Sequence, residues 1–235
     1  MSFFFASMVV EFQNCEVHIV KVRFICLSFV LLLSSAAFCQ DKVPTLKDLS
    51  AEFMLRGYFY AGSTIVDKNA LGGFGGSSNV PKPIEMGDMF PSPGISLAAF
   101  PNEETPFAKE YKGFKVRLAN TSDEPVSFSA SDSRLYIIQE AKDGNGNWNP
   151  IEYLPSSWCG NSYHSVFLGP NQYWEFAAPK FAGSIKTKLR FRLQIVKGKS
   201  LDFVYSNEFD GFINPKQFTV EQGHKPTSIM DPYNN

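Results

Sequence analysis

The chain has 235 residues, with 22 lysines and arginines against 23 aspartates and glutamates. This near balance of charge produces no strong field, so nucleic acid and anionic membrane surfaces are not expected partners. The chain also has 23 phenylalanines, 17 glycines and 15 prolines, and these separate short β-branched and aromatic runs. Such a composition favours an all-β domain over a helical one.

Residues 21–39 have the pattern of a secretory signal peptide. Lys21 and Arg23 precede an apolar run that ends in small residues before Cys39. The run has about a dozen residues, which is too short to cross the hydrocarbon core of a membrane as a helix. We therefore expect the rest of the chain to be exported to the periplasm or the extracellular space, with no membrane span after the signal is removed.

The start of this signal and its cleavage site are also predicted. Signals begin close to their cations, whereas about twenty residues precede them here, so we expect a later start at Val20 or, alternatively, at Met8. Cleavage is expected just before Gln40. A lipid-anchored Cys39 is the minor alternative, because lipoprotein signals need a small residue before the cysteine and Phe38 stands there.

The chain is expected to fold as one domain after residues 1–39 are removed. Residues 40–93 form an amino-terminal extension with one strand, near residues 54–66, and a loop rich in glycine and proline. Residues 94–221 form the main domain, and residues 222–235 a carboxy-terminal tail. Of the four cysteines, three precede Gln40, so the exported part has one thiol and no internal disulfide.

Strand signals become regular from Gly94 onward. Strands are predicted at residues 95–100, 113–120, 126–130, 134–141, 148–153, 163–168, 173–177, 186–196 and 201–212. Between the fourth and fifth, the sequence DGNGN at residues 143–147 supplies the positive φ angles of a tight hairpin. In the eighth, apolar residues from Leu189 to Ile195 alternate with polar ones, which indicates one buried face. Together these features predict an antiparallel two-sheet β-sandwich, immunoglobulin-like or jelly-roll.

Two segments carry a loose family resemblance. The strand over residues 115–125, which ends in NTSDEP, resembles the equivalent turn of many bacterial immunoglobulin-like domains, and YSNEF at residues 205–209 looks like their last strand. The Cys-Trp-Cys core of antibody domains is missing from the sequence. The resemblance, to exported bacterial immunoglobulin-like β-sandwich proteins, implies a module that binds or braces a partner and does not catalyse a reaction.

Rare residue types concentrate just before the predicted strand at residues 163–168. They are Trp158, Cys159, Asn161, Tyr163 and His164. Cys159 and His164 are the residue types of a cysteine-dependent hydrolase, but such enzymes draw nucleophile and base from distant segments. We expect instead a structural loop in which Trp158 and Tyr163 close one end of the sandwich, Gly160 has a positive φ and Cys159 is buried.

The aromatic residues support an alternative function. Trp158, Tyr163 and Trp174, with Trp148 and Tyr173, would suit an accessory carbohydrate-binding module if their rings were exposed, whereas in a sandwich most such rings fill the core. The leading hypothesis is a non-enzymatic module that contacts an unknown protein, through the loop at residues 69–93.

No cofactor or metal is expected. The exported part has two histidines and no zinc spacing. The DGNGN run has the alternating oxygens of a calcium loop, but Leu154 occupies the place of the glutamate that closes such a loop. The GGFGG run at residues 72–76 lacks the lysine of a phosphate-binding loop.

Overall fold

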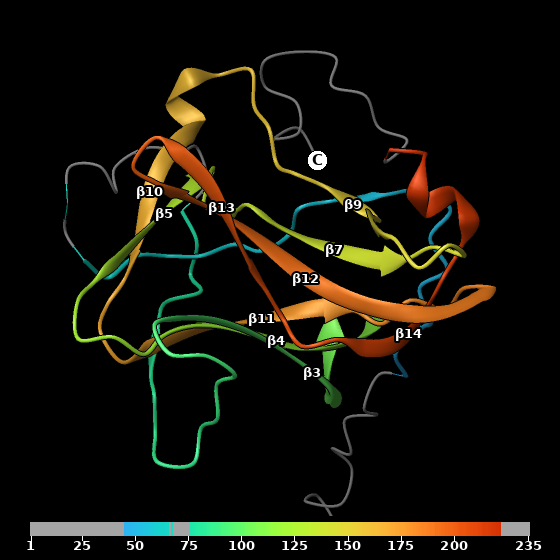
Figure 1. Cartoon of the computed structure of the whole chain (residues 1–235), viewed down its shortest axis with the longest axis horizontal. Coiled ribbons are helices and arrows are strands. Elements are labelled where there is room, and N and C mark those ends of the chain that lie inside the picture. The colour runs from blue at the N-terminus through green and yellow to red at the C-terminus, as the bar shows by residue number, and fades with distance from the viewer. Residues whose placement is uncertain (1–44, 66, 68–75, 222–235) are drawn as a thin grey trace, which may run out of the picture. The chain divides into compact units, whose positions relative to one another are not determined.

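The computed structural model describes residues 45–65, 67 and 76–221 (Figure 1). The predicted signal peptide, start sites and carboxy-terminal tail lie outside the described residues, as do residues 68–75 of the glycine-rich loop.

The described chain consists of strands and turns, with two short 3₁₀ helices. This confirms the predicted all-β class. The elements are β1 (Leu55–Arg56), β2 (Lys82–Pro83), β3 (Ile95–Phe107), β4 (Tyr111–Asn120), β5 (Val126–Ser131), β6 (Arg134–Leu135), β7 (Ile137–Lys142), β8 (Trp148–Pro150), β9 (Glu152–Tyr153), η2 (Gly160–Ser162), β10 (Tyr163–Leu168), β11 (Gln172–Pro179), β12 (Ile185–Lys197), β13 (Ser200–Tyr205), β14 (Phe209–Ile213) and η3 (Pro215–Phe218).

Antiparallel sheets enclose the core in a sandwich-like arrangement. One sheet has the order β13-β12-β7-β8, with β14 also paired to β12, and a second has the order β2-β11-β4-β3. Figure 1 shows β7 and β12 on one side and β11, β4 and β3 on the other. A three-stranded sheet, β10-β5-β6, and a parallel β1–β9 pair complete the described strands.

The predicted alternation along β12 is confirmed. Leu189, Phe191, Leu193 and Ile195 are all buried, as are Phe114, Val116 and Leu118 of β4 on the facing sheet. Phe191 packs against Phe209 and Phe114, with ring centroids 5.9 and 6.1 Å apart. Period-two apolar residues from both sheets therefore meet in one core.

The predicted hairpin between β7 and β8 is also confirmed. Lys142 pairs with Trp148 across the turn, and Gly146 has a φ of 83°. The Asp143 carboxylate accepts hydrogen bonds from the backbone N–H groups of Asn145 and Asn147 at 2.8 and 2.9 Å. These bonds lower the pKa of Asp143 and hold the turn.

Several predicted strands have different boundaries in the structure: those at 134–141 and 148–153 are each divided into two, as β6 and β7 and as β8 and β9. β3 continues past Pro101 to Phe107, because a bulge between Phe100 and Glu104 absorbs the proline. The predicted strand at 201–212 is divided at Ser206 and Asn207. The Ser206 hydroxyl accepts a bond from the Phe191 N–H at 2.9 Å. The Asn207 side chain bonds the Ala99 backbone N–H and C=O at 2.8 and 3.0 Å, and so joins the two main sheets.

Within residues 54–65, the described part of the predicted first strand, the only named strand is the two-residue β1. Phe59 and Ala61 are nevertheless fully buried members of the core. Phe59 contacts Phe176 and Phe191 edge-on, with centroids 5.3 and 5.6 Å apart.

Candidate functional site

The segment at residues 157–164 is held by polar contacts to Ser157. The Tyr163 hydroxyl donates to the Ser157 carbonyl at 2.8 Å and accepts from its N–H at 3.2 Å. The Ser162 and Ser157 hydroxyl oxygens lie 2.8 Å apart. These contacts fold the chain around η2 before it enters β10.

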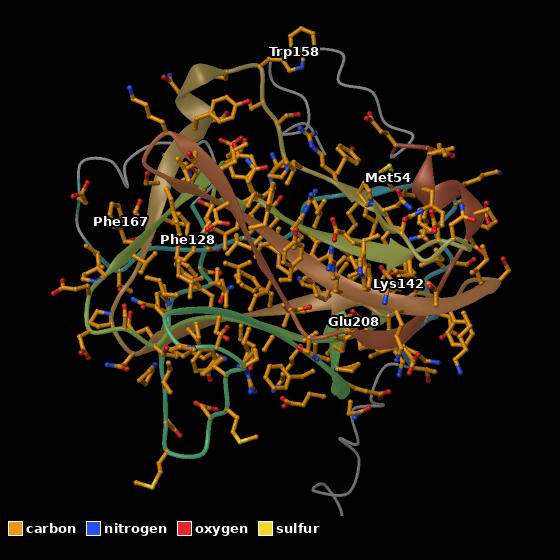
Figure 2. The ribbon with its side chains drawn as sticks, in the orientation of Figure 1. Met54, Phe128, Lys142, Trp158, Phe167 and Glu208 are labelled. Atoms are coloured by element: carbon orange, nitrogen blue, oxygen red, sulfur yellow. The ribbon has the colours of Figure 1, made fainter. Side chains whose placement is uncertain are left out.

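The two aromatic rings of this segment point into solvent. Trp158 is 78% exposed and Tyr163 is 49% exposed, and Figure 2 shows Trp158 projecting away from the sheets. The prediction that they close the sandwich is therefore wrong. The interior beside β5 is filled by Phe128 and Trp174, whose ring centroids lie 5.7 Å apart. Gly160 also does not have the predicted positive φ, because η2 gives it a right-handed conformation.

Cys159 and His164 form hydrogen bonds with different parts of the chain. Cys159 is half-buried, and its backbone N–H donates to the Ser157 hydroxyl at 3.2 Å. His164 Nε2 accepts a hydrogen bond from the Ser133 N–H at 2.9 Å. The imidazole nitrogen that would have to deprotonate a thiol is thus engaged by the β5–β6 turn. Asn161, the third residue type of the hydrolase alternative, is exposed.

The turn between β5 and β6 contacts residues 162–164, which the sequence did not predict. Asp132 and Ser133 are buried and have φ angles of 48° and 64°, in the left-handed region. The Asp132 N–H donates to the Ser162 carbonyl at 2.8 Å. The predicted strands at 126–130 and 134–141 leave a short connection here, but no glycine or asparagine in it indicates its left-handed conformation, and nothing in the sequence indicates its contact with Ser162.

Trp174 is separate from the exposed aromatic residues. It is fully buried in β11, and its indole N–H donates to the Gly62 carbonyl at 2.9 Å. Trp174 is therefore a core residue, and presents no ring face to a ligand.

The loop that precedes β3 carries the most exposed apolar side chains. Met86 is 105% exposed relative to a reference residue, and Met89 is 83% exposed. In Figure 1 this green segment projects beyond the sheet of β4 and β11. We call residues 84–90 the methionine loop.

Both the apex and the base of the methionine loop are ordered by hydrogen bonds. At the apex, the Glu85 N–H donates to the Asp88 carboxylate at 2.9 Å, and the Asp88 N–H donates to the Glu85 carbonyl at 3.1 Å. Gly87 has a φ of 108°, which suits glycine alone. At the base, the Ile84 N–H donates to the Asn171 carbonyl at 2.9 Å.

Ionic and aromatic contacts fix the same base to β11. Lys82 and Arg117 both lie 3.0 Å from the Glu175 carboxylate. Burial raises the pKa of Glu175, but the hydrogen bonds from Lys82 and Arg117 outweigh it, so the pKa is lowered overall. The Phe90 ring lies 5.9 Å from the Tyr173 ring, which extends the attachment to the loop's far end.

A cation–π stack covers the outer face of the largest sheet. The Arg190 guanidinium lies 4.2 Å from the Trp148 ring and 4.1 Å from the Tyr205 ring. The Lys142 ammonium lies 4.9 Å from the centroid of the same Trp148 ring and 3.4 Å from the Glu208 carboxylate, and Figure 2 labels both charged residues. The sequence predicts this face to be solvated, but its cations are stacked on aromatic rings.

A buried carboxyl group lies among the core residues. The Tyr58 hydroxyl donates to Glu152 Oε1 at 2.8 Å, and the Gln139 N–H donates to Oε2 at 2.9 Å. Burial raises the pKa of Glu152 to about 8, although both hydrogen bonds oppose the shift. Burial of this carboxyl therefore favours its protonated form.

Among the described residues, no cluster of three or more histidine, cysteine, aspartate or glutamate side chains is placed to hold a metal ion. In the same part of the chain, the structure has no helix with the length and hydropathy of a membrane span. Comparisons with protein-family models, curated proteins and solved structures gave no match.

Proposed function

We propose that the protein is an exported, non-enzymatic module that binds another protein through the methionine loop. The observation that carries the proposal is the exposure of Met86 and Met89, 105% and 83%, on a loop whose base is fixed to β11. The export component rests on the sequence pattern of residues 21–39.

Exposed methionines suit protein contact for two physical reasons. Covering a large apolar side chain stabilises a complex by about 1.5–3 kcal/mol. Burial of Met86 and Met89 in an interface would therefore contribute substantially to the free energy of binding. The unbranched thioether also adapts to the shape of a partner surface. Because the loop base is already ordered, little additional backbone entropy is lost on binding.

The charge of the apex defines the partner further. Glu85 directly precedes Met86 and Asp88 directly precedes Met89, and neither carboxylate forms an ion pair within the described residues. An acidic rim around an apolar tip is complementary to a pocket that is apolar at its centre and basic at its edge. We therefore assign the partner as a protein with such a pocket.

Site-specific crosslinking in the producing cell tests this function. A photo-crosslinking residue at Met86 should give one discrete protein adduct, and excess wild-type protein should compete it away. The double variant M86S/M89S should not compete. The same crosslinker at Leu201, which is 60% exposed on β13, is the matched control. Equal adducts at both positions, or none at Met86, would reject the proposal.

Carbohydrate binding is a second candidate, favoured by the 78% exposure of Trp158. Tyr163 lies half-exposed in the same segment and would extend a stacking surface. A glycan array should then lose its signal in W158A, while Y173A retains it. An unchanged array in W158A would exclude this candidate.

A further inference from the structure

An apolar pocket of about 290 Å³ opens beside β14. Its lining comes from β12 and β14 on one side and from β4 and the end of β11 on the other. The volume is close to the lower end of the range for small-molecule sites. Its apolar lining includes Phe114, Phe181, Leu189, Phe209 and Phe212.

The pocket reaches the core beside the edge of β14 that has no partner strand in the described chain. β14 pairs with β12 and with no other named strand in the described chain. Gly211 adds no side chain there, and a Cβ at this position would overlap the Leu189 side chain. Leu189, Phe114 and Phe209 are themselves buried core residues, so an occupant would contact the interior of the sandwich.

The charged groups of the lining are mostly cationic. Lys180 and Lys186 line the pocket, and both are exposed. Asp210, the one acidic residue of the lining, lies 3.1 Å from Lys188 and is thereby balanced. Lys180 contacts Glu104 at 3.3 Å, but that carboxylate is 71% exposed, so the pair is weak and exchangeable. Lys186 forms no ion pair with any described carboxylate.

We propose that this pocket binds a small amphipathic anion, a carboxylate with a short aliphatic tail. The tail would lie against Phe114, Leu189 and Phe209, and the carboxylate would approach the ammonium groups of Lys180 and Lys186. Apolar burial supplies the affinity, and the two cations select an anion over a neutral or cationic molecule. The site is independent of the methionine loop and adds a ligand to the proposed function.

Calorimetric titration of the purified exported protein with octanoate tests the proposal. We expect saturable binding at one site per chain, weaker binding of octanol, and weaker binding still of octylammonium. The double variant K180M/K186M should bind octanoate about tenfold more weakly, whereas K197M, which removes an exposed lysine at the other end of β12 and outside the pocket lining, should remain within about twofold of wild type. All three lysines are on the surface, so these variants should fold.

Nuclear magnetic resonance locates the bound molecule. Octanoate should shift the methyl resonances of Leu189 and leave those of Leu201, on the exposed face of β13, unchanged. Shifts at Leu201 alone, equal affinity for octanoate and octylammonium, or no saturable binding would each overturn the proposal. M86S/M89S should bind octanoate as the wild type does, so this result does not depend on the methionine loop.

Discussion

Glu140 lies directly opposite Arg190 across β7 and β12, and its Oε2 is 2.8 Å from both Nε and Nη2 of that guanidinium. Its other oxygen, Oε1, lies 3.1 Å from Arg192 Nε. The Glu140 side chain is only 5% exposed, because the stacked rings of Trp148 and Tyr205 flank the Arg190 guanidinium. One shielded carboxylate thus balances two arginines on the outer face of the sheet.

Replacing Glu140 should therefore destabilise the fold. In E140A the two arginines would lose their shared acceptor while remaining packed against aromatic rings, and we expect a loss of about 3 kcal/mol in the free energy of unfolding. Urea denaturation followed by fluorescence measures this loss. D210N removes an exposed partner of Lys188 on the same sheet, and should cost less than about 1 kcal/mol. Equal losses in both variants would contradict the special role of Glu140.

This cluster shows which part of the fold local sequence patterns predict. Alternation along residues 186–196 correctly places Leu189 in the core and Arg190 on the opposite face. It does not predict the rings of Trp148 and Tyr205 around Arg190, because they come from separate strands. Period two assigns a side chain to a face, whereas its neighbours on that face depend on strand order.

The candidate sites were predicted less well than the fold. The hairpin at residues 143–147 has turn residues with a local physical signal, and the structure has it as expected. Trp158 has no such signal: its size favours burial on average, but the space was already filled by Trp174. Residues 76–93, the described part of the predicted loop, are irregular apart from the two-residue strand β2, but the exposure of Met86 could not be predicted from its glycines and prolines.

The turn between β3 and β4 is strained by two residues that are not glycine. Ala108 and Lys109 have φ angles of 47° and 65°. Only glycine adopts this region without a steric cost, so K109G should raise the free energy of unfolding by about 1 kcal/mol. Thermal denaturation gives the measurement. K109A keeps a Cβ in the same conformation and should show no gain, so equal stabilisation by both variants would refute the strain argument.

Export makes a prediction that is independent of the folded domain. Cleavage after Cys39 would leave Gln40 as the first residue of the exported protein. Mass spectrometry of the protein recovered outside the cytoplasm should show a chain that begins at Gln40, partly cyclised. Retention of residues 21–39 in the recovered protein would contradict the signal-peptide interpretation.

Glu152 predicts a dependence of stability on pH. Its pKa is about 8 in the folded protein, against 4.5 for the free side chain, because burial disfavours the charged form. Between these two values the folded chain holds a proton that the unfolded chain has lost. The contribution of Glu152 to the free energy of unfolding should therefore be largest below pH 4.5 and should decrease as the pH rises toward 8.

The E152Q variant isolates this contribution. Its amide carbonyl could accept the Gln139 N–H and its amide nitrogen could donate to the Tyr58 oxygen, so both contacts of Glu152 have neutral replacements. Since the glutamine does not titrate, the difference in stability between E152Q and wild type should shift in favour of E152Q as the pH rises from 4.5 to 8. Urea denaturation across this range measures the difference. A constant difference would mean that Glu152 has an ordinary pKa and that the cluster with Tyr58 does not couple folding to pH.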